Sequence, residues 1–153
     1  MTAIAYSEAV RERCREPRRA GAWPDGDRAV ATGSAGSLDA GAWTRLQLRV
    51  GADGRVADTR FKVFGCSAAI ASASYVADAL VGATLAEARR LAPADVAEAL
   101  GLPEDKGAMA ALATTAARAA VDAWERQMGA GGAGLGAANV ASAGRAADAG
   151  ERR

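Results

Sequence analysis

The chain has 153 residues with 19 basic and 18 acidic side chains, which suits one domain whose core needs neither disulfide nor metal to fold. The nearly balanced charge argues against nucleic acid or an anionic membrane as a partner. The sequence contains no apolar run of about eighteen residues that could span a bilayer and no signal-peptide pattern, so we expect a cytoplasmic protein without a membrane segment.

The first part of the chain predicts a helix followed by a long loop. Residues 7–15 favour a helix with Ser7 as its N-cap and Cys14 on its apolar side, and Pro17 ends it. Residues 18–42 are rich in Gly, Asp and Ser, which indicates an irregular segment.

The middle of the chain predicts an antiparallel hairpin. Residues 43–50 alternate apolar and polar side chains over eight positions, the period of a half-buried strand. A Gly/Asp turn at 51–54 leads into a second predicted strand at 56–64.

Helices are predicted for most of the remaining chain, at residues 67–81, 84–91, 93–101 and 107–128. Residues 129–153 are Gly- and Ala-rich and cannot bury enough surface to offset the entropy of ordering, so we expect a flexible tail after a domain of residues 1–128. The order of elements predicts an α+β fold, with a small antiparallel sheet of about three strands and helices packed on one face.

The lack of histidine is the most restrictive feature of the composition. Neither a Ser-His-Asp nor a Cys-His nucleophile can form, so we do not expect an enzyme, and a His-ligated zinc site is excluded. The two cysteines, Cys14 and Cys66, cannot supply four thiolates within one chain. A metal site would need carboxylates, a cofactor's own atoms or a second subunit.

Four segments together resemble the IscU/NifU family of iron–sulfur cluster assembly scaffolds. Residues 61–74 fit the signature F-x-x-x-G-C-x-x-x-x-A-S-x-S, and residues 5–8 with 17–18, 45–50 and 102–106 are similar to other family segments in the same order. The resemblance covers about residues 5–127 and implies the family's fold. It also implies one exposed site, which in the family contains three cysteines, an aspartate and a histidine.

Most of that ligand set is missing. The middle cysteine falls on Cys66, whereas the other four positions fall on Ala40, Ala42, Ala108 and Met109. Alanine has no donor atom, and a thioether is a poor ligand for ferric iron. We therefore expect iron or an iron–sulfur cluster only if it is bridged between two subunits that each provide Cys66, with Cys14, Asp39 or an exogenous thiol completing the set.

Each candidate ligand has a plainer alternative. Cys66 lies at a strand-to-helix junction, where it could be a ligand or reactive thiol or equally a packing residue. For Cys14 a core thiol is favoured over a second ligand. For Asp39 a local turn contact is favoured over a metal contact.

Tyr6 and Lys106 are candidate partner contacts by the same resemblance. The implied partners are a cysteine desulfurase, another scaffold subunit or a second copy of this chain. The loop 102–106 carries Glu-Asp where the family has Pro-Val, which should weaken recognition by the family's chaperone. The hypothesis is an iron–sulfur assembly scaffold-like protein that acts by binding partners; the alternative is a metal-free regulatory or structural interaction protein.

Overall fold

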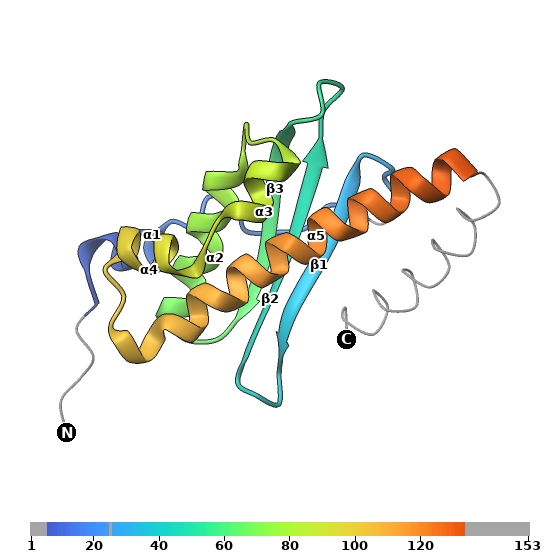
Figure 1. Ribbon diagram of the computed structural model, residues 1–153. Coiled ribbons are helices and arrows are strands. Elements are labelled where there is room, and N and C mark those ends of the chain that lie inside the picture. The colour runs from blue at the N-terminus through green and yellow to red at the C-terminus, as the bar shows by residue number, and fades with distance from the viewer. Residues whose placement is uncertain (1–5, 25, 134–153) are drawn as a thin grey trace.

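The computed structural model describes residues 6–24 and 26–133. Its elements follow in the order α1 (Glu8–Arg15), β1 (Val30–Ser37), β2 (Ala42–Val50), β3 (Val56–Phe64), α2 (Ser67–Leu80), α3 (Leu85–Arg90), α4 (Pro93–Leu100), η1 (Glu104–Lys106) and α5 (Gly107–Ala133) (Figure 1). The α+β class and the helix and strand types predicted from residue 43 onward are confirmed. None of the helices described is long and apolar enough to cross a membrane.

The sheet has three antiparallel strands in the order β1-β2-β3, so β2 is central. Leu46 in β2 faces Gly33 on one side and Phe61 on the other. Leu46, Leu48 and Phe61 are almost fully buried and form the sheet's side of the core.

The first strand corrects the prediction of a loop over residues 18–42. Residues 30–37, Val-Ala-Thr-Gly-Ser-Ala-Gly-Ser, lack the alternating large apolar side chains that mark a strand. They form one because β1 packs closely on α5. A Cβ atom at Gly33 would collide with the backbone of Ala116 and Ala120 and lie 2.6 Å from the carbonyl carbon of Ala119.

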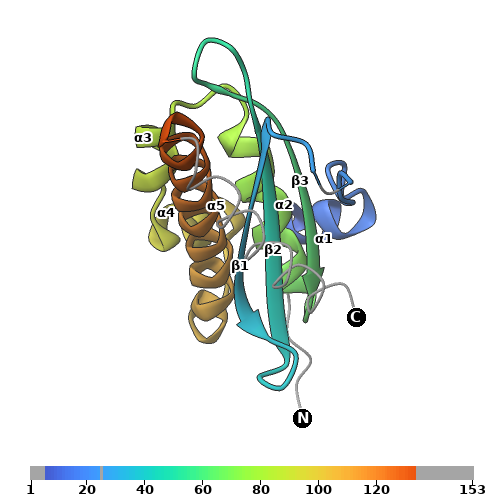
Figure 2. The ribbon, with the colours of Figure 1, turned by 90° about the vertical axis from the view of Figure 1, so that its right-hand side faces the viewer.

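The helices pack on one face of the sheet. Figure 2 shows α5 alongside β1, with α3 and α4 on the far side of α5 from the sheet. Helix α2 covers β3 and also contacts α5, while α1 packs on α2. The α5 face is made of small buried residues: Ala110, Ala113, Ala116, Ala117, Ala120 and Val121.

The segment before β1 covers the outer edge of β3. The Gly21 amide donates to the Phe61 carbonyl at 2.8 Å, and the Phe61 amide donates to the Arg19 carbonyl at 3.0 Å. Trp23 then lies against the guanidinium groups of both Arg49 and Arg60, with ring-centre distances of 4.7 and 4.8 Å. The polar face of the sheet is thereby partly covered.

Local capping explains where the short helices begin. Ser7 accepts a hydrogen bond from the Val10 amide at the start of α1. The predicted capping box of α3 is confirmed, because Thr84 and Glu87 satisfy each other's backbone amides. The predicted domain end at residue 128 falls inside α5, which continues to Ala133, and the rest of the predicted tail lies outside the described residues.

Candidate functional site

Cys66 is placed by a sharp turn between β3 and α2. Gly65 has φ +154°, at the limit of the region that favours glycine, and a Cβ there would lie 2.9 Å from Cβ of Ala69. Cys66 follows as the N-cap of α2, but its side chain makes no capping hydrogen bond. The half-buried thiol therefore lies beside the positive end of the helix dipole.

Tyr6 lies near this thiol and near Lys106. Partial burial raises the pKa of the Tyr6 phenol, and the nearby Cys66 raises this pKa further. Lys106 is close enough to lower the same pKa in part. Three of the five candidate residues therefore lie in one region. They are Tyr6 in the N-terminal segment, Cys66 at the β3–α2 junction and Lys106 in η1.

Cys14 approaches the same junction from α1. Its Sγ lies 3.4 Å from the carbonyl oxygen of Ser67, the residue that follows Cys66. Together with Tyr6, Ser67 and other residues of α1, Cys14 lines a cavity of about 240 Å³. Cys14 is also half-buried and packs against the core.

Asp39 belongs to the β1–β2 turn, at the end of the sheet where β3 leads into Cys66. It is exposed in the turn between β1 and β2, where the Gly41 amide donates to the Leu38 carbonyl at 3.0 Å. Across the described residues, no group of three or more Cys, Asp or Glu side chains is arranged to hold a metal ion.

One of the positions where a family ligand is missing lies beside the Cys66 junction. Ala42, where the family carries its aspartate, has its Cβ 3.5 Å from a Cβ built at Gly65. Phe64, paired with Trp43 at the same end of the sheet, is 52% exposed, and Leu38 in the adjoining turn is 60% exposed. The end of the sheet next to Cys66 therefore exposes two large apolar side chains.

Sequence reasoning missed an ion cluster that holds α1 to α2. Asp78 accepts hydrogen bonds from Arg13 at 2.7 Å and Arg19 at 2.8 Å, and Arg18 lies 3.5 Å away. Burial alone would raise the pKa of Asp78, but the hydrogen bonds from Arg13 and Arg19 outweigh it and lower the pKa below its ordinary value. No local pattern in the sequence indicates this contact, because its partners are about sixty residues apart.

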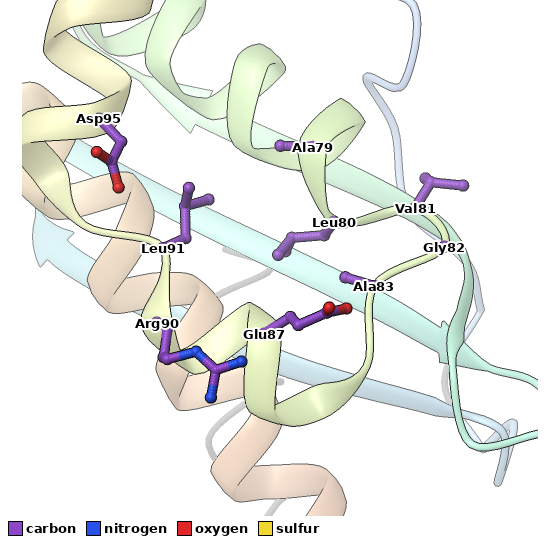
Figure 3. Close-up of a pocket in the computed structure, with 9 residues that line it drawn as sticks. All are labelled: Ala79, Leu80, Val81, Gly82, Ala83, Glu87, Arg90, Leu91 and Asp95. Carbon is purple, nitrogen blue, oxygen red and sulfur yellow. The ribbon is translucent and has the colours of Figure 1, made fainter.

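A second cavity, of about 550 Å³, opens between the end of α2 and the helices α3 and α4 (Figure 3). Glu87 and Asp95 line it, but both carboxylates already accept hydrogen bonds from backbone amides at helix N-termini. Glu87 accepts from the Thr84 amide at 2.9 Å, and Asp95 accepts from the Ala92 amide at 3.4 Å. This arrangement favours a structural role for the two acids.

The fold and the Cys66 junction define a scaffold-type α+β domain, and comparison with known proteins identifies the family. Residues 5–130 match the family described as NifU-like N terminal domain. The chain belongs to this family, which confirms the resemblance seen in the sequence.

Two bacterial relatives and one from yeast are similar over most of this chain. It is 38% identical over 118 residues to the iron–sulfur cluster assembly scaffold protein IscU of Escherichia coli K12, covering 77% of this chain and 92% of that protein. It is 36% identical over 126 residues to IscU of Azotobacter vinelandii, with 82% and 98% covered. Iron sulfur cluster assembly protein 1 of Schizosaccharomyces pombe, a mitochondrial protein, is 40% identical over 116 residues, with 76% and 60% covered.

Solved structures share the fold. A protein assigned to iron–sulfur cluster assembly in the SUF system of Fervidobacterium islandicum has a TM-score of 0.59 at 16% identity, covering 76% of this chain and 96% of that one. The N-terminal part of a NifU-like protein from Brucella abortus has a TM-score of 0.58 at 24% identity, with 78% and 93% covered.

Proposed function

We propose that this protein is an iron–sulfur cluster assembly scaffold-like protein of the cytoplasm that acts by binding other proteins of the assembly pathway and not by catalysis. The observation that carries the proposal is Cys66. It is the N-cap of α2, near Tyr6, and the family resemblance assigns its position to a ligand within a fold that the family shares.

One chain does not provide enough donor atoms to hold an iron–sulfur cluster. Iron–sulfur clusters are usually held by four thiolates, and this chain has two cysteines, of which only Cys66 is at a family ligand position. A cluster carried as cargo would therefore be shared by two subunits. Each subunit would contribute Cys66, with Cys14, whose sulfur contacts the residue after Cys66, or Asp39 or an exogenous thiol as a further donor.

The end of the molecule around Cys66 is suited to partner binding. Leu38 and Phe64 are both large, apolar and more than half exposed there, and such side chains gathered in one place favour a protein contact. Tyr6 adds a hydroxyl near Cys66, and Lys106 adds a positive charge near Tyr6. A cysteine desulfurase, another scaffold subunit or a second copy of this chain would dock at this end.

Anaerobic reconstitution with ferrous iron and sulfide tests the proposal. We expect visible charge-transfer absorption that co-elutes with a two-chain species in size-exclusion chromatography and is lost in Cys66→Ser. The matched control is Met128→Leu, a change in an exposed sulfur-containing side chain near the other end of α5. A stoichiometric cluster on a single chain, or one that persists in Cys66→Ser, would overturn the shared-cargo proposal.

The alternative is a metal-free regulatory or structural interaction protein that keeps only the fold. The lack of any three-donor group among the described residues favours it. A chain that stays colourless after reconstitution but still copurifies with a cysteine desulfurase would support this alternative. A chain that neither takes up a cluster nor binds a desulfurase would contradict both.

A further inference from the structure

The inference concerns the outer face of the sheet, in the half that lies next to Cys66. The helices pack on the face that carries the buried leucines of β2, and side chains alternate along a strand, so Trp43 and Arg45 belong to the other face. In the register of the sheet, Trp43 lies opposite Phe64 and Arg45 lies opposite Lys62. These four residues are termed the Trp43 patch.

The other half of the outer face has its charges matched within the chain. Trp23 lies against the guanidinium groups of Arg49 and Arg60 and covers them in part. Arg49 is paired with Asp27 at 2.8 Å, and Arg60 is paired with Asp58 at 3.1 Å. This half therefore offers little that a charged partner could recognise.

The Trp43 patch has a cation that is not matched in this way. Lys62 is exposed and makes no ion pair with any residue that the structure describes. Its neighbour directly across the strand pair is Arg45, and like charges in such a position are unfavourable. Arg45 itself is buried, with its guanidinium 5.9 Å from the ring centre of Trp43. A carboxylate from outside would supply Lys62 with the opposite charge that the described residues do not place within ion-pair distance.

The patch also has an apolar part. Phe64 is strongly exposed, Trp43 beside it is half-buried, and Leu38 in the adjoining β1–β2 turn is strongly exposed. Leu38 and Phe64 are two of the three large apolar side chains that are exposed in the described part of the chain. Exposed aromatic and aliphatic side chains gathered in one place favour a protein contact.

We propose that the Trp43 patch binds an acidic, partly apolar segment of another protein, which places a carboxylate at Lys62 and an apolar side chain on Phe64 and Trp43. This inference rests on the proposed function and names the chemistry of the partner. Single-stranded nucleic acid also stacks on aromatic rings, but it needs a groove of positive charge that follows its backbone. The patch has one exposed cation, and the exposed Asp39 in the adjoining turn further disfavours such a polyanion.

The test is a titration of the reduced full-length protein with three synthetic peptides. The first alternates glutamate with leucine and phenylalanine, the second has lysine for each glutamate, and the third has glycine for each apolar residue. We expect the first to bind at low salt, the other two to bind about tenfold more weakly or not at all, and Lys62→Glu to weaken the first about tenfold. Arg126→Glu makes the same change in net charge at an exposed arginine of α5 and should bind as the unmodified chain does. Equal affinity for the first two peptides, or unchanged affinity in Lys62→Glu, would overturn the proposal.

A measurement without any substitution protects the test from a folding defect in the variant. Lys62 and Lys106 are the two lysines of the chain, so carbon-13 methylation, which keeps their charge, gives each its own NMR signal. The first peptide should shift the Lys62 signal more than the Lys106 signal. A larger shift at Lys106, or a shift of Lys62 by a single-stranded oligonucleotide at the same concentration, would overturn the proposal.

Failure of this inference can be distinguished from failure of the proposed function. A chain that copurifies with a cysteine desulfurase while the first peptide leaves the Lys62 signal unshifted would overturn the acidic partner alone. A chain that neither copurifies with a desulfurase nor takes up a cluster would overturn the proposed function, whatever the peptides do.

Discussion

Two regions of the molecule differ in what they require of their side chains. One is the contact between β1 and α5, and the other is the end of the molecule around Cys66. At the first, Gly33 lies against a buried alanine face, and even one added methyl group would meet helix backbone. At the second, Ala40 and Ala108 are exposed and Met109 is half-buried. Substitutions at these three positions are outside the packed core, whereas Ala42, the fourth altered position, is buried.

This difference explains how a scaffold fold can persist without most of its ligands. The core depends on volume and shape at every position, because interiors are close-packed. The ligand site depends on the chemistry of a few side chains at the end of the sheet, and their loss costs little stability. Fold and metal chemistry can therefore diverge within one family.

Restoring metal-binding side chains near Cys66 should have the largest effect. Ala40→Cys combined with Met109→Cys places three thiols at family positions, so we expect a single chain to go from no stoichiometric cluster to about one cluster after anaerobic reconstitution. Iron and sulfide analysis of the monomer peak checks this. Ala40→Ser with Met109→Ser is the matched control and should stay colourless; a colourless double-cysteine protein would mean that the backbone at this end no longer fits a cluster.

The opposite change, at the β1–α5 contact, should act on stability alone. Gly33→Ala forces the strand away from α5, because the clashing atoms are backbone atoms of the helix and cannot rotate aside. We expect a loss of about 3 kcal/mol in the free energy of unfolding, measured by chemical denaturation.

Gly107→Ala is the matched control, since it makes the same change at a helical glycine with open space around it. Its free energy of unfolding should be unchanged or about 0.5–1 kcal/mol higher. Equal stabilities of the two variants would show that β1 and α5 are not in close contact.

The same two regions show what the sequence could and could not predict. The β3–Gly65–Cys66–α2 junction was predictable, because an alternating strand, a glycine and a helical pattern are all local signals. Strand β1 was not, because its Gly/Ala/Ser composition makes sense only against the small residues of α5. Likewise Cys14 reaches Ser67, and Asp78 reaches Arg13, only through the packing of α1 on α2.

A smaller loss of stability is expected from a change at the contact between α1 and α2. Asp78→Asn leaves the guanidinium groups of Arg13 and Arg19 without their carboxylate, and we expect a loss of about 1–2 kcal/mol in the free energy of unfolding near neutral pH. Glu98→Gln, which removes an exposed carboxylate on α4, is the control and should change stability by less than about 0.5 kcal/mol.

The difference in the free energy of unfolding between the unmodified chain and Asp78→Asn should decrease as the pH falls. Because the pKa of Asp78 is lower in the folded state, its contribution is complete above the unfolded value of about 3.9 and disappears as the pH falls through the folded value. Denaturation at a series of acidic pH values should therefore bring the two stabilities together. A gap that widens on acidification would contradict the contact.

The smallest effect concerns the pair at the centre of the site. Tyr75→Phe leaves Tyr6 as the single tyrosine, and carbon-13 NMR of its ring can then follow its titration. We expect a pKa above the ordinary value of about 10, since burial and Cys66 both raise it. Adding Cys66→Ser should lower that pKa without returning it fully, because burial, the larger cause, remains. If the pKa did not respond to this change, Tyr6 would not lie close to Cys66 in solution.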